Sequence, residues 1–311
     1  MKNNLLFWTL FNLFVLLMLV LDLGVFHRRA RTVKFREALI WSGVWVSLAA
    51  IFALLVLSWE GHTAALEFTT GYLIELSLSV DNLFVFLLIF RYFHVSGSHQ
   101  HKVLFWGIVG ALIMRGIFIL AGVTLIRRFE WIPYVFGAFL IYTGIQLFRH
   151  KEMEVHPEGN TLVRALRRWL PVTRDFEGNR FFVRRKPGLC ATPLLVVLLV
   201  VETTDLLFAV DSIPAVLAIT IDPFIVYTSN VFAILGLRSM YFALAGMMET
   251  FHYLHYGLAV ILVLIGAKML AAHYYVVPTH ISLAGVAAVL GLSIMASIVF
   301  PEREEVTTDA E

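Results

Sequence analysis

The stretch VVETTDLLFAVDSIPAVLAIT, residues Val200–Thr220, combines a membrane-like apolar composition with three acidic side chains. These are Glu202, Asp205 and Asp211. A charge near the centre of a bilayer costs at least ~2.5–3.5 kcal/mol, even on the insertion scale that gives the smallest values. Ionisable residues inside membrane segments are functional by default, so this stretch predicts a binding site within the membrane.

The rest of the chain has the composition of a polytopic membrane protein. Of its 311 residues, 59% are hydrophobic and only 15% are charged, whereas soluble domains are about 25% charged. Apolar runs long enough to cross a bilayer, about 20 residues, recur along the whole chain. We therefore predict an all-α polytopic membrane protein with about nine transmembrane helices, at Leu5–Phe26, Ala38–Leu57, Phe68–Phe90, Val103–Ile126, Trp131–Phe148, Ala191–Ile219, Pro223–Met248, Tyr253–Ala272 and Ile281–Phe300.

The basic residues are distributed unevenly over the predicted loops. Of the 24 Lys and Arg residues, 18 lie on one side of the predicted membrane and three on the other. Because cytoplasmic loops are enriched in Lys and Arg, the basic loop Arg149–Cys190 and the C-terminus are expected in the cytoplasm, with the N-terminus outside. The histidines of RYFHVSGSHQH, including His99 and His101, are expected on a solvated cytoplasmic loop. The remaining basic residues, Arg115, Arg238 and Lys268, lie within predicted spans.

The acidic stretch has a counterpart earlier in the chain. ELSLSVDNLFVFL (Glu75–Leu87) aligns without gaps with DLLFAVDSIPAVL (Asp205–Leu217), and LIMRGIFILAG around Arg115 resembles LGLRSMYFALAG around Arg238. IYTGIQLF at 141–148 then matches VLIGAKML at 263–270. The alignment pairs Glu75 with Asp205, Asp81 with Asp211, and Asn82 with Ser212.

Two three-span repeats follow from this alignment. Three crossings reverse the direction of the chain, so the repeats must be inverted, an arrangement typical of transporters with a site near the midplane. We predict a single transmembrane domain whose parts are two leading spans (1–66), repeat 1 (67–148), a basic loop (149–190), repeat 2 (191–272), and a last span with a cytoplasmic tail (273–311).

The acidic and polar positions of both repeats supply only oxygen ligands, which hard divalent cations such as Mg²⁺, Ca²⁺ and Mn²⁺ prefer. On a regular helix Asp81 lies about 120° from Glu75, so we expect both helices to be broken there. Pro214 favours a break because it frees the Val210 carbonyl. The alternative is that the carboxylates pair with the intramembrane basic residues purely for packing. The predicted metal ligands are Glu75, Asp81, Asn82, Glu202, Asp205, Asp211 and Ser212.

Several segments resemble one known family. TGYLIELSLSVDNLFVF, FFVRRKPGLCATPLLVVLLVVETTDLLFAVDSIPAVLAIT, DPFIVYTSNVFAILGLRSMYF and YGLAVILVLIGAKML are similar to the TerC family of bacterial integral membrane proteins. The family was named for tellurium resistance, is associated with manganese export, and is similar in fold to the LysE superfamily of exporters. The resemblance implies Mn²⁺ as the transported ion, a location in the bacterial plasma (inner) membrane, and metal-binding roles for Glu75, Asp81, Asp205 and Asp211.

The leading hypothesis is a Mn²⁺ exporter driven by a H⁺ or Na⁺ gradient, with other hard divalent cations as further substrates. The alternative is a membrane scaffold, an assembly factor or a component of a tellurium-resistance complex, without transport. The sequence contains no nucleotide-binding loop, no nucleophile–base pair and a single cysteine, Cys190. We therefore expect neither enzyme activity, nor an organic cofactor, nor a nucleic-acid partner.

Overall fold

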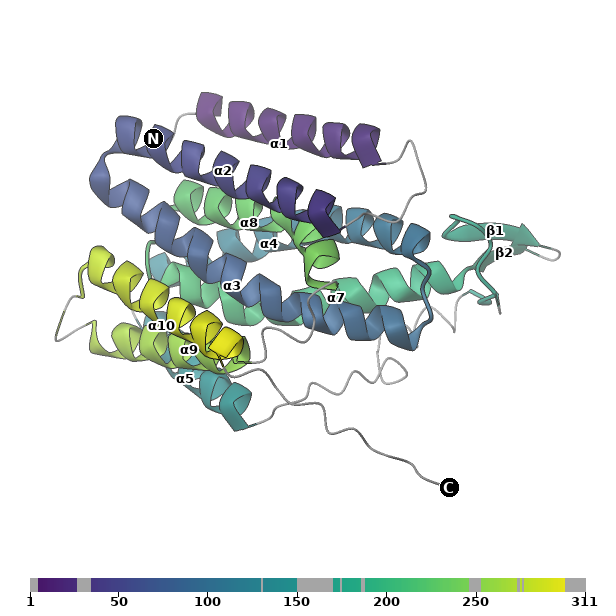
Figure 1. Ribbon diagram of the computed structural model, residues 1–311. Coiled ribbons are helices and arrows are strands. Elements are labelled where there is room, and N and C mark those ends of the chain that lie inside the picture. Colours follow the sequence, from purple (N-terminus) through teal and green to yellow (C-terminus); the bar gives the residue numbers. More distant parts are fainter. Residues whose placement is uncertain are drawn as a thin grey trace, which may run out of the picture.

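A computed structural model describes residues 5–26, 35–129, 131–149, 170–173, 175–185, 188–245, 253–272, 275 and 277–299. Its helices run roughly alongside one another (Figure 1). α1 and α2 lie along one side of the molecule, α5, α9 and α10 lie along the other, and α3, α4, α7 and α8 fill the space between. The bounds are α1 Leu5–Phe26, α2 Phe35–Glu60, α3 His62–Tyr92, α4 Gly97–Arg128, α5 Ile132–Arg149, α7 Pro193–Leu217, α8 Pro223–Ala245, α9 Leu254–Ala271 and α10 Thr279–Val299.

Most of the described helices contain apolar stretches of the kind found in membrane spans. Within the described ranges, α2, α5, α7, α10 and the His99–Arg128 part of α4 are long and apolar enough to cross a bilayer, and two shorter apolar stretches lie in α1 and α9. Large apolar side chains such as Leu13, Leu54 and Leu292 are exposed on the outer helices, as lipid-facing residues would be. The chain is thus a polytopic helical membrane protein, and the number of nine crossings stays a prediction.

Two of the apolar clusters in the described interior lie on either side of the acidic residues along α3 and α7. One includes apolar residues between 83 and 90 on α3 and between 194 and 201 on α7, together with parts of α4 and α8. The other includes Ile74 and Leu78 of α3 and apolar residues between 209 and 217 on α7, with parts of α5 and α9. Glu75 and Asp205 therefore lie between two tightly packed apolar regions, where water has little access.

The prediction of broken helices is wrong. α3 and α7 each run as one continuous helix through the acidic motifs. Pro214 lies inside α7, but only one turn from its end at Leu217. The missing amide of a proline disturbs the preceding turn, and a position so near the C-terminus leaves the rest of the helix intact. The acidic side chains therefore approach one another through the packing of whole helices.

The predicted start of α8 is confirmed. Asp222 precedes Pro223, the first residue of the helix, and its Oδ1 accepts a hydrogen bond of 3.0 Å from the backbone N–H of Phe224. This is the usual role of an N-cap aspartate, which satisfies an amide that has no partner within the helix. Proline at the first position has no amide to satisfy.

The basic loop contains a small hairpin that the sequence pattern did not predict. β1 (Phe182–Arg185) pairs antiparallel with β2 (Gly188–Ala191), with Val183 opposite Cys190. The turn before the hairpin contacts the start of α4, where Lys102 lies 4.3 Å above the ring of Phe181. His99 and His101 lie in the first turns of α4, so their expected place on a solvated loop is wrong, and His101 is buried because it packs on Phe242.

Candidate cation site

Three charged side chains from three helices meet in the interior. Glu75 lies in the middle of α3, Arg115 in the middle of α4 and Asp205 in the middle of α7. Their exposed fractions are 0%, 1% and 4%, respectively. Burial of this extent removes nearly all hydration, so the stability of each charge depends on its protein partners.

Arg115 joins the two acidic residues. Its Nε and Nη2 donate to the two carboxylate oxygens of Asp205 at 3.2 and 3.0 Å, the planar two-pronged contact typical of arginine. Its Nη1 forms an ion pair with Glu75 Oε1 and also donates to Ser212 Oγ at 3.4 Å. One guanidinium thus connects the first acidic motif, on α3, to the second, on α7.

The charges of this trio do not balance. Glu75 and Asp205 carry two negative charges, and Arg115 supplies one positive charge. Glu75 Oε2 has no hydrogen-bond partner among the described residues. A buried carboxylate oxygen without a partner is costly, so this position is suited to a further cation or proton.

The polar neighbours of the two predicted aspartates are also buried. Ser212 is 1% exposed and accepts the hydrogen bond from Arg115, whereas Asn82 is 4% exposed and its Nδ2 has no partner in the described part of the chain. Asp81 and Asp211 precede them in α3 and α7, but the side chains of these two aspartates lie outside the described residues.

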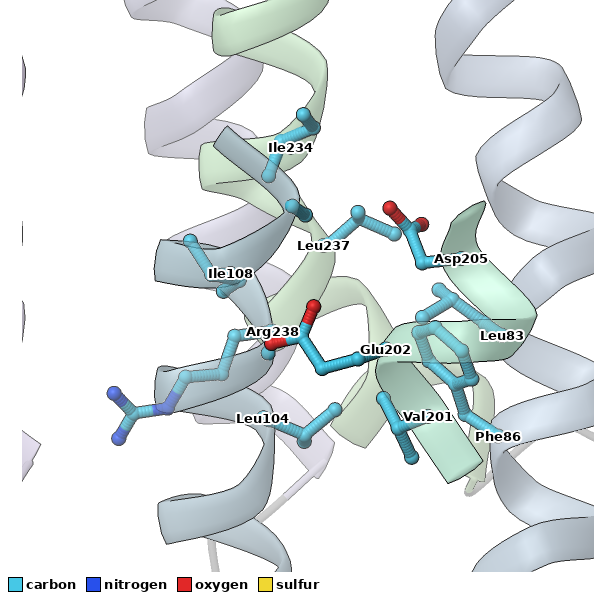
Figure 2. Close-up of a pocket in the computed structure, with 12 residues that line it drawn as sticks. Leu83, Phe86, Leu104, Ile108, Val201, Glu202, Asp205, Ile234, Leu237 and Arg238 are labelled. Atoms are coloured by element: carbon cyan, nitrogen blue, oxygen red, sulfur yellow. The ribbon is translucent and has the colours of Figure 1, made fainter. Parts of the chain in front are cut away.

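Glu202 lies one turn before Asp205 on the same face of α7. It lines a pocket with an otherwise mostly apolar wall, formed by side chains of α3, α4, α7 and α8 (Figure 2). Its Oε2 has no hydrogen-bond partner among the described residues. The carboxylate fits because Gly110 of α4 has no side chain, and a Cβ there would collide with it.

Arg238, the counterpart of Arg115 in the second repeat, is placed differently. It lines the same pocket, but Figure 2 shows its guanidinium directed away from the carboxylates of Glu202 and Asp205. Its Nη2 lies 3.3 Å from His101 Nδ1. The two halves of the molecule thus use their buried arginines differently in this conformation.

The structure brings together only part of the predicted ligand set. Glu75, Asp205 and Ser212 share Arg115, and Glu202 lines the neighbouring pocket with Asp205. Among the residues whose side chains are described, no three His, Cys, Asp or Glu side chains form a group that could hold a metal ion. Glu75 and Asp205 adopt the arrangement that the packing alternative anticipates, in which an internal arginine pairs with the buried acids.

Arg115 was not among the predicted ligands, and it entered only the alternative in which basic residues pair with the acids for packing. Its position within an apolar span was visible in the sequence. Its choice of partners was not visible, because Glu75 and Asp205 lie 40 and 90 residues away along the chain. His101 was missed as a buried residue for the same reason.

Comparison with known proteins identifies relatives over nearly the whole chain. A membrane protein of Myxococcus xanthus, "Uncharacterized membrane protein STKORF319", is 52% identical over 98% of this chain and 95% of its own length. Proteins of Escherichia coli strain K12 and Photorhabdus laumondii, both named "Putative membrane-bound redox modulator Alx", are 47% and 44% identical over 94% of each chain.

No solved structure matches this chain. The family described as "Integral membrane protein TerC family" matches residues 60–305, which include both acidic motifs and Arg115. Together with the relatives above, this match shows that the chain belongs to the TerC family of integral membrane proteins.

Proposed function

We propose that this protein transports divalent metal cations across the bacterial plasma membrane, with Mn²⁺ export as its main activity. The observation that carries the proposal is the meeting of Glu75 and Asp205, from the two acidic motifs, at one buried position. Carboxylates at such depth are expensive to maintain. Binding of a doubly charged ion explains why both carboxylates are present there, whereas packing alone does not.

The packing of the helices supports the inverted repeat on which this mechanism depends. α5 packs against α9, α3 packs against α8, and α4 packs against α7. This set of pairs is unchanged when α3, α4 and α5 are exchanged for α7, α8 and α9, as a two-fold axis requires. A transporter built from such repeats exposes a central site to either side of the membrane by exchanging the conformations of its halves.

Close contacts between α5 and α9 also support the repeat. A Cβ on Gly137 would lie 2.9 Å from the carbonyl oxygen of Gly266, and one on Gly144 would lie 2.8 Å from that of Ala259. The sequence alignment pairs Gly144 with Gly266, and continuing it pairs Gly137 with Ala259. Exchange of the repeats therefore converts one close contact into the other.

The name of the Alx relatives raises a redox function as a competing hypothesis. This chain contains a single cysteine, Cys190, which is buried in β2. An internal dithiol–disulfide couple needs two cysteines. The buried acidic residues therefore favour cation transport over a redox function based on an internal disulfide.

The orientation in the membrane is part of the proposal. The loop at 149–190 carries ten of the 24 basic residues and lies in the cytoplasm with the C-terminus, while the N-terminus lies outside. Reporter fusions within this loop and at both termini test the orientation, and an external location of the loop would overturn it.

The decisive experiment replaces the acids by their amides. Asp81→Asn, Asp211→Asn and Glu75→Gln keep size and hydrogen bonding but remove the charge that replaces the water shell of the ion. We expect each variant to reach normal membrane abundance, to lose protection against excess Mn²⁺ in cells, and to lose Mn²⁺ transport in membrane vesicles. Glu177→Gln is the matched control, because Glu177 is partly exposed and pairs with Arg185 outside the membrane helices.

Two results would contradict the proposal. Transport at the wild-type rate in the amide variants would show that the buried acids are not ligands of the transported ion. Failure of these variants to accumulate in the membrane, with Glu177→Gln unaffected, would assign the carboxylates to folding and favour the scaffold or assembly-factor hypothesis.

A further inference from the structure

We propose that Arg115 occupies the place of the transported cation in the unloaded protein, so that Arg115 and a divalent cation bind Glu75 and Asp205 in turn. This inference rests on the proposed function and deepens it. It makes Arg115 a tethered competitor at the site and makes a doubly charged ion the preferred ligand.

The contacts of Arg115 support mutual exclusion. The guanidinium engages both oxygens of Asp205, together with Glu75 Oε1 and Ser212 Oγ. A metal ion that coordinated both acids would need the Asp205 oxygens that the guanidinium engages and the space between the two carboxylates that the guanidinium occupies. Because Arg115 comes from α4, whereas the acids come from α3 and α7, it can withdraw while the acidic residues keep their helical positions.

The charges of the trio support selection for divalent ions. With Arg115 in place, the two carboxylates retain one uncompensated negative charge, and Glu75 Oε2 has no hydrogen-bond partner in the described part of the chain. A divalent cation in place of the guanidinium would neutralise both acids. A monovalent cation would restore only the charge that Arg115 already supplies and would forfeit its directed hydrogen bonds. Na⁺ and K⁺ therefore do not displace Arg115 from the two carboxylates, whereas Mn²⁺ does.

Metal binding by the purified full-length protein tests this inference. Mn²⁺ is titrated into the wild type, Arg115→Met, Arg115→Lys and Arg127→Met by isothermal titration calorimetry, with and without excess Na⁺. Arg127 is the control, because it lies on the same helix but is exposed and donates to the Ile221 carbonyl oxygen at 3.2 Å, away from the acids. The temperature of unfolding is recorded for each protein with and without Mn²⁺.

Removal of the Arg115 guanidinium should strengthen metal binding. If Arg115 occupies the site at least nine-tenths of the time, Arg115→Met should bind Mn²⁺ about tenfold more tightly or better, because apparent affinity scales with the fraction of competent sites. Arg115→Lys keeps the positive charge but lacks the two-pronged guanidinium contact, so it should bind Mn²⁺ about two- to fivefold more tightly than the wild type. Na⁺ should weaken Mn²⁺ binding in Arg115→Met but not in the wild type. Arg127→Met should match the wild type.

The outcomes separate this inference from the proposed function. Equal or weaker Mn²⁺ binding in Arg115→Met, with binding in the wild type, would overturn the tethered competitor and leave the transporter proposal intact. Absence of Mn²⁺ binding and of Mn²⁺-dependent stabilisation in every protein would overturn both. If Arg115→Met fails to fold, Arg115→Lys decides, since unchanged or weaker binding there contradicts the inference and tighter binding supports it.

Discussion

Removal of Arg115 should damage the protein less when one of its acidic partners is removed as well. Arg115→Met leaves Glu75 and Asp205 buried without a countercharge, and breaking a buried ion pair costs about 3–5 kcal/mol. An upper bound comes from protonating both acids. For an ordinary carboxyl group, whose pKa in water is about 4, protonation at pH 7 costs about 4 kcal/mol, or about 8 kcal/mol for two. The variant should therefore lose about 3–8 kcal/mol of unfolding free energy.

Adding Glu75→Gln to Arg115→Met should restore part of this loss. The double variant has one uncompensated carboxylate instead of two, so it should recover up to about 4 kcal/mol relative to Arg115→Met. For a chain of this size about 1 kcal/mol corresponds to about 2 °C, so the double variant should unfold up to about 8 °C higher.

The assay is thermal unfolding of the purified protein in detergent, followed by tryptophan fluorescence. Glu177→Gln, Arg185→Met and their combination are the control, because this pair is largely exposed and a surface ion pair contributes about 0–1 kcal/mol. No rescue larger than about 2 °C is expected there. If the losses of Glu75→Gln and Arg115→Met simply add in the double variant, then the buried acids do not depend on Arg115 and the reasoning is refuted.

Three further predictions concern other parts of the molecule. Gly144→Val should lower the unfolding free energy by about 1–3 kcal/mol, because α5 must move away from α9, whereas Gly43→Val, whose Cβ would meet nothing within 4 Å, should change little by the same thermal assay. Asp222→Ala should lower the unfolding temperature by about 2 °C, since the loss of an N-cap costs about 1 kcal/mol; an unchanged temperature would contradict its capping role. His99→Ala should leave Mn²⁺ export in vesicles at the wild-type rate, because its ring contacts the Gly178 carbonyl oxygen at 3.0 Å, outside the candidate site; a loss of export would place this histidine on the ion path.

The sequence predicted the helices better than it predicted the site. The predicted spans coincide closely with helices of the structure, as at Leu5–Phe26 for α1, because an apolar run must satisfy its backbone hydrogen bonds internally within a bilayer. The start of α8 at Pro223 was also predicted, because it depends on the adjacent residues Asp222 and Pro223. The hairpin at residues 182–191 was missed, because its short apolar strands lie within a basic loop.

What the sequence alone determined is the chemistry available inside the membrane. It placed Glu75, Asp205 and Arg115 within apolar spans and matched the two acidic motifs. Tertiary structure alone decided how these groups combine. Arg115 contacts both acids, and Arg238 lies beside His101. Local sequence fixes which helix carries each charge, but the partner of a charge depends on distances between helices far apart in the chain. α7 is a continuous helix, and the long side chain of Arg115 on α4 reaches Asp205 without any break in the backbone of α7.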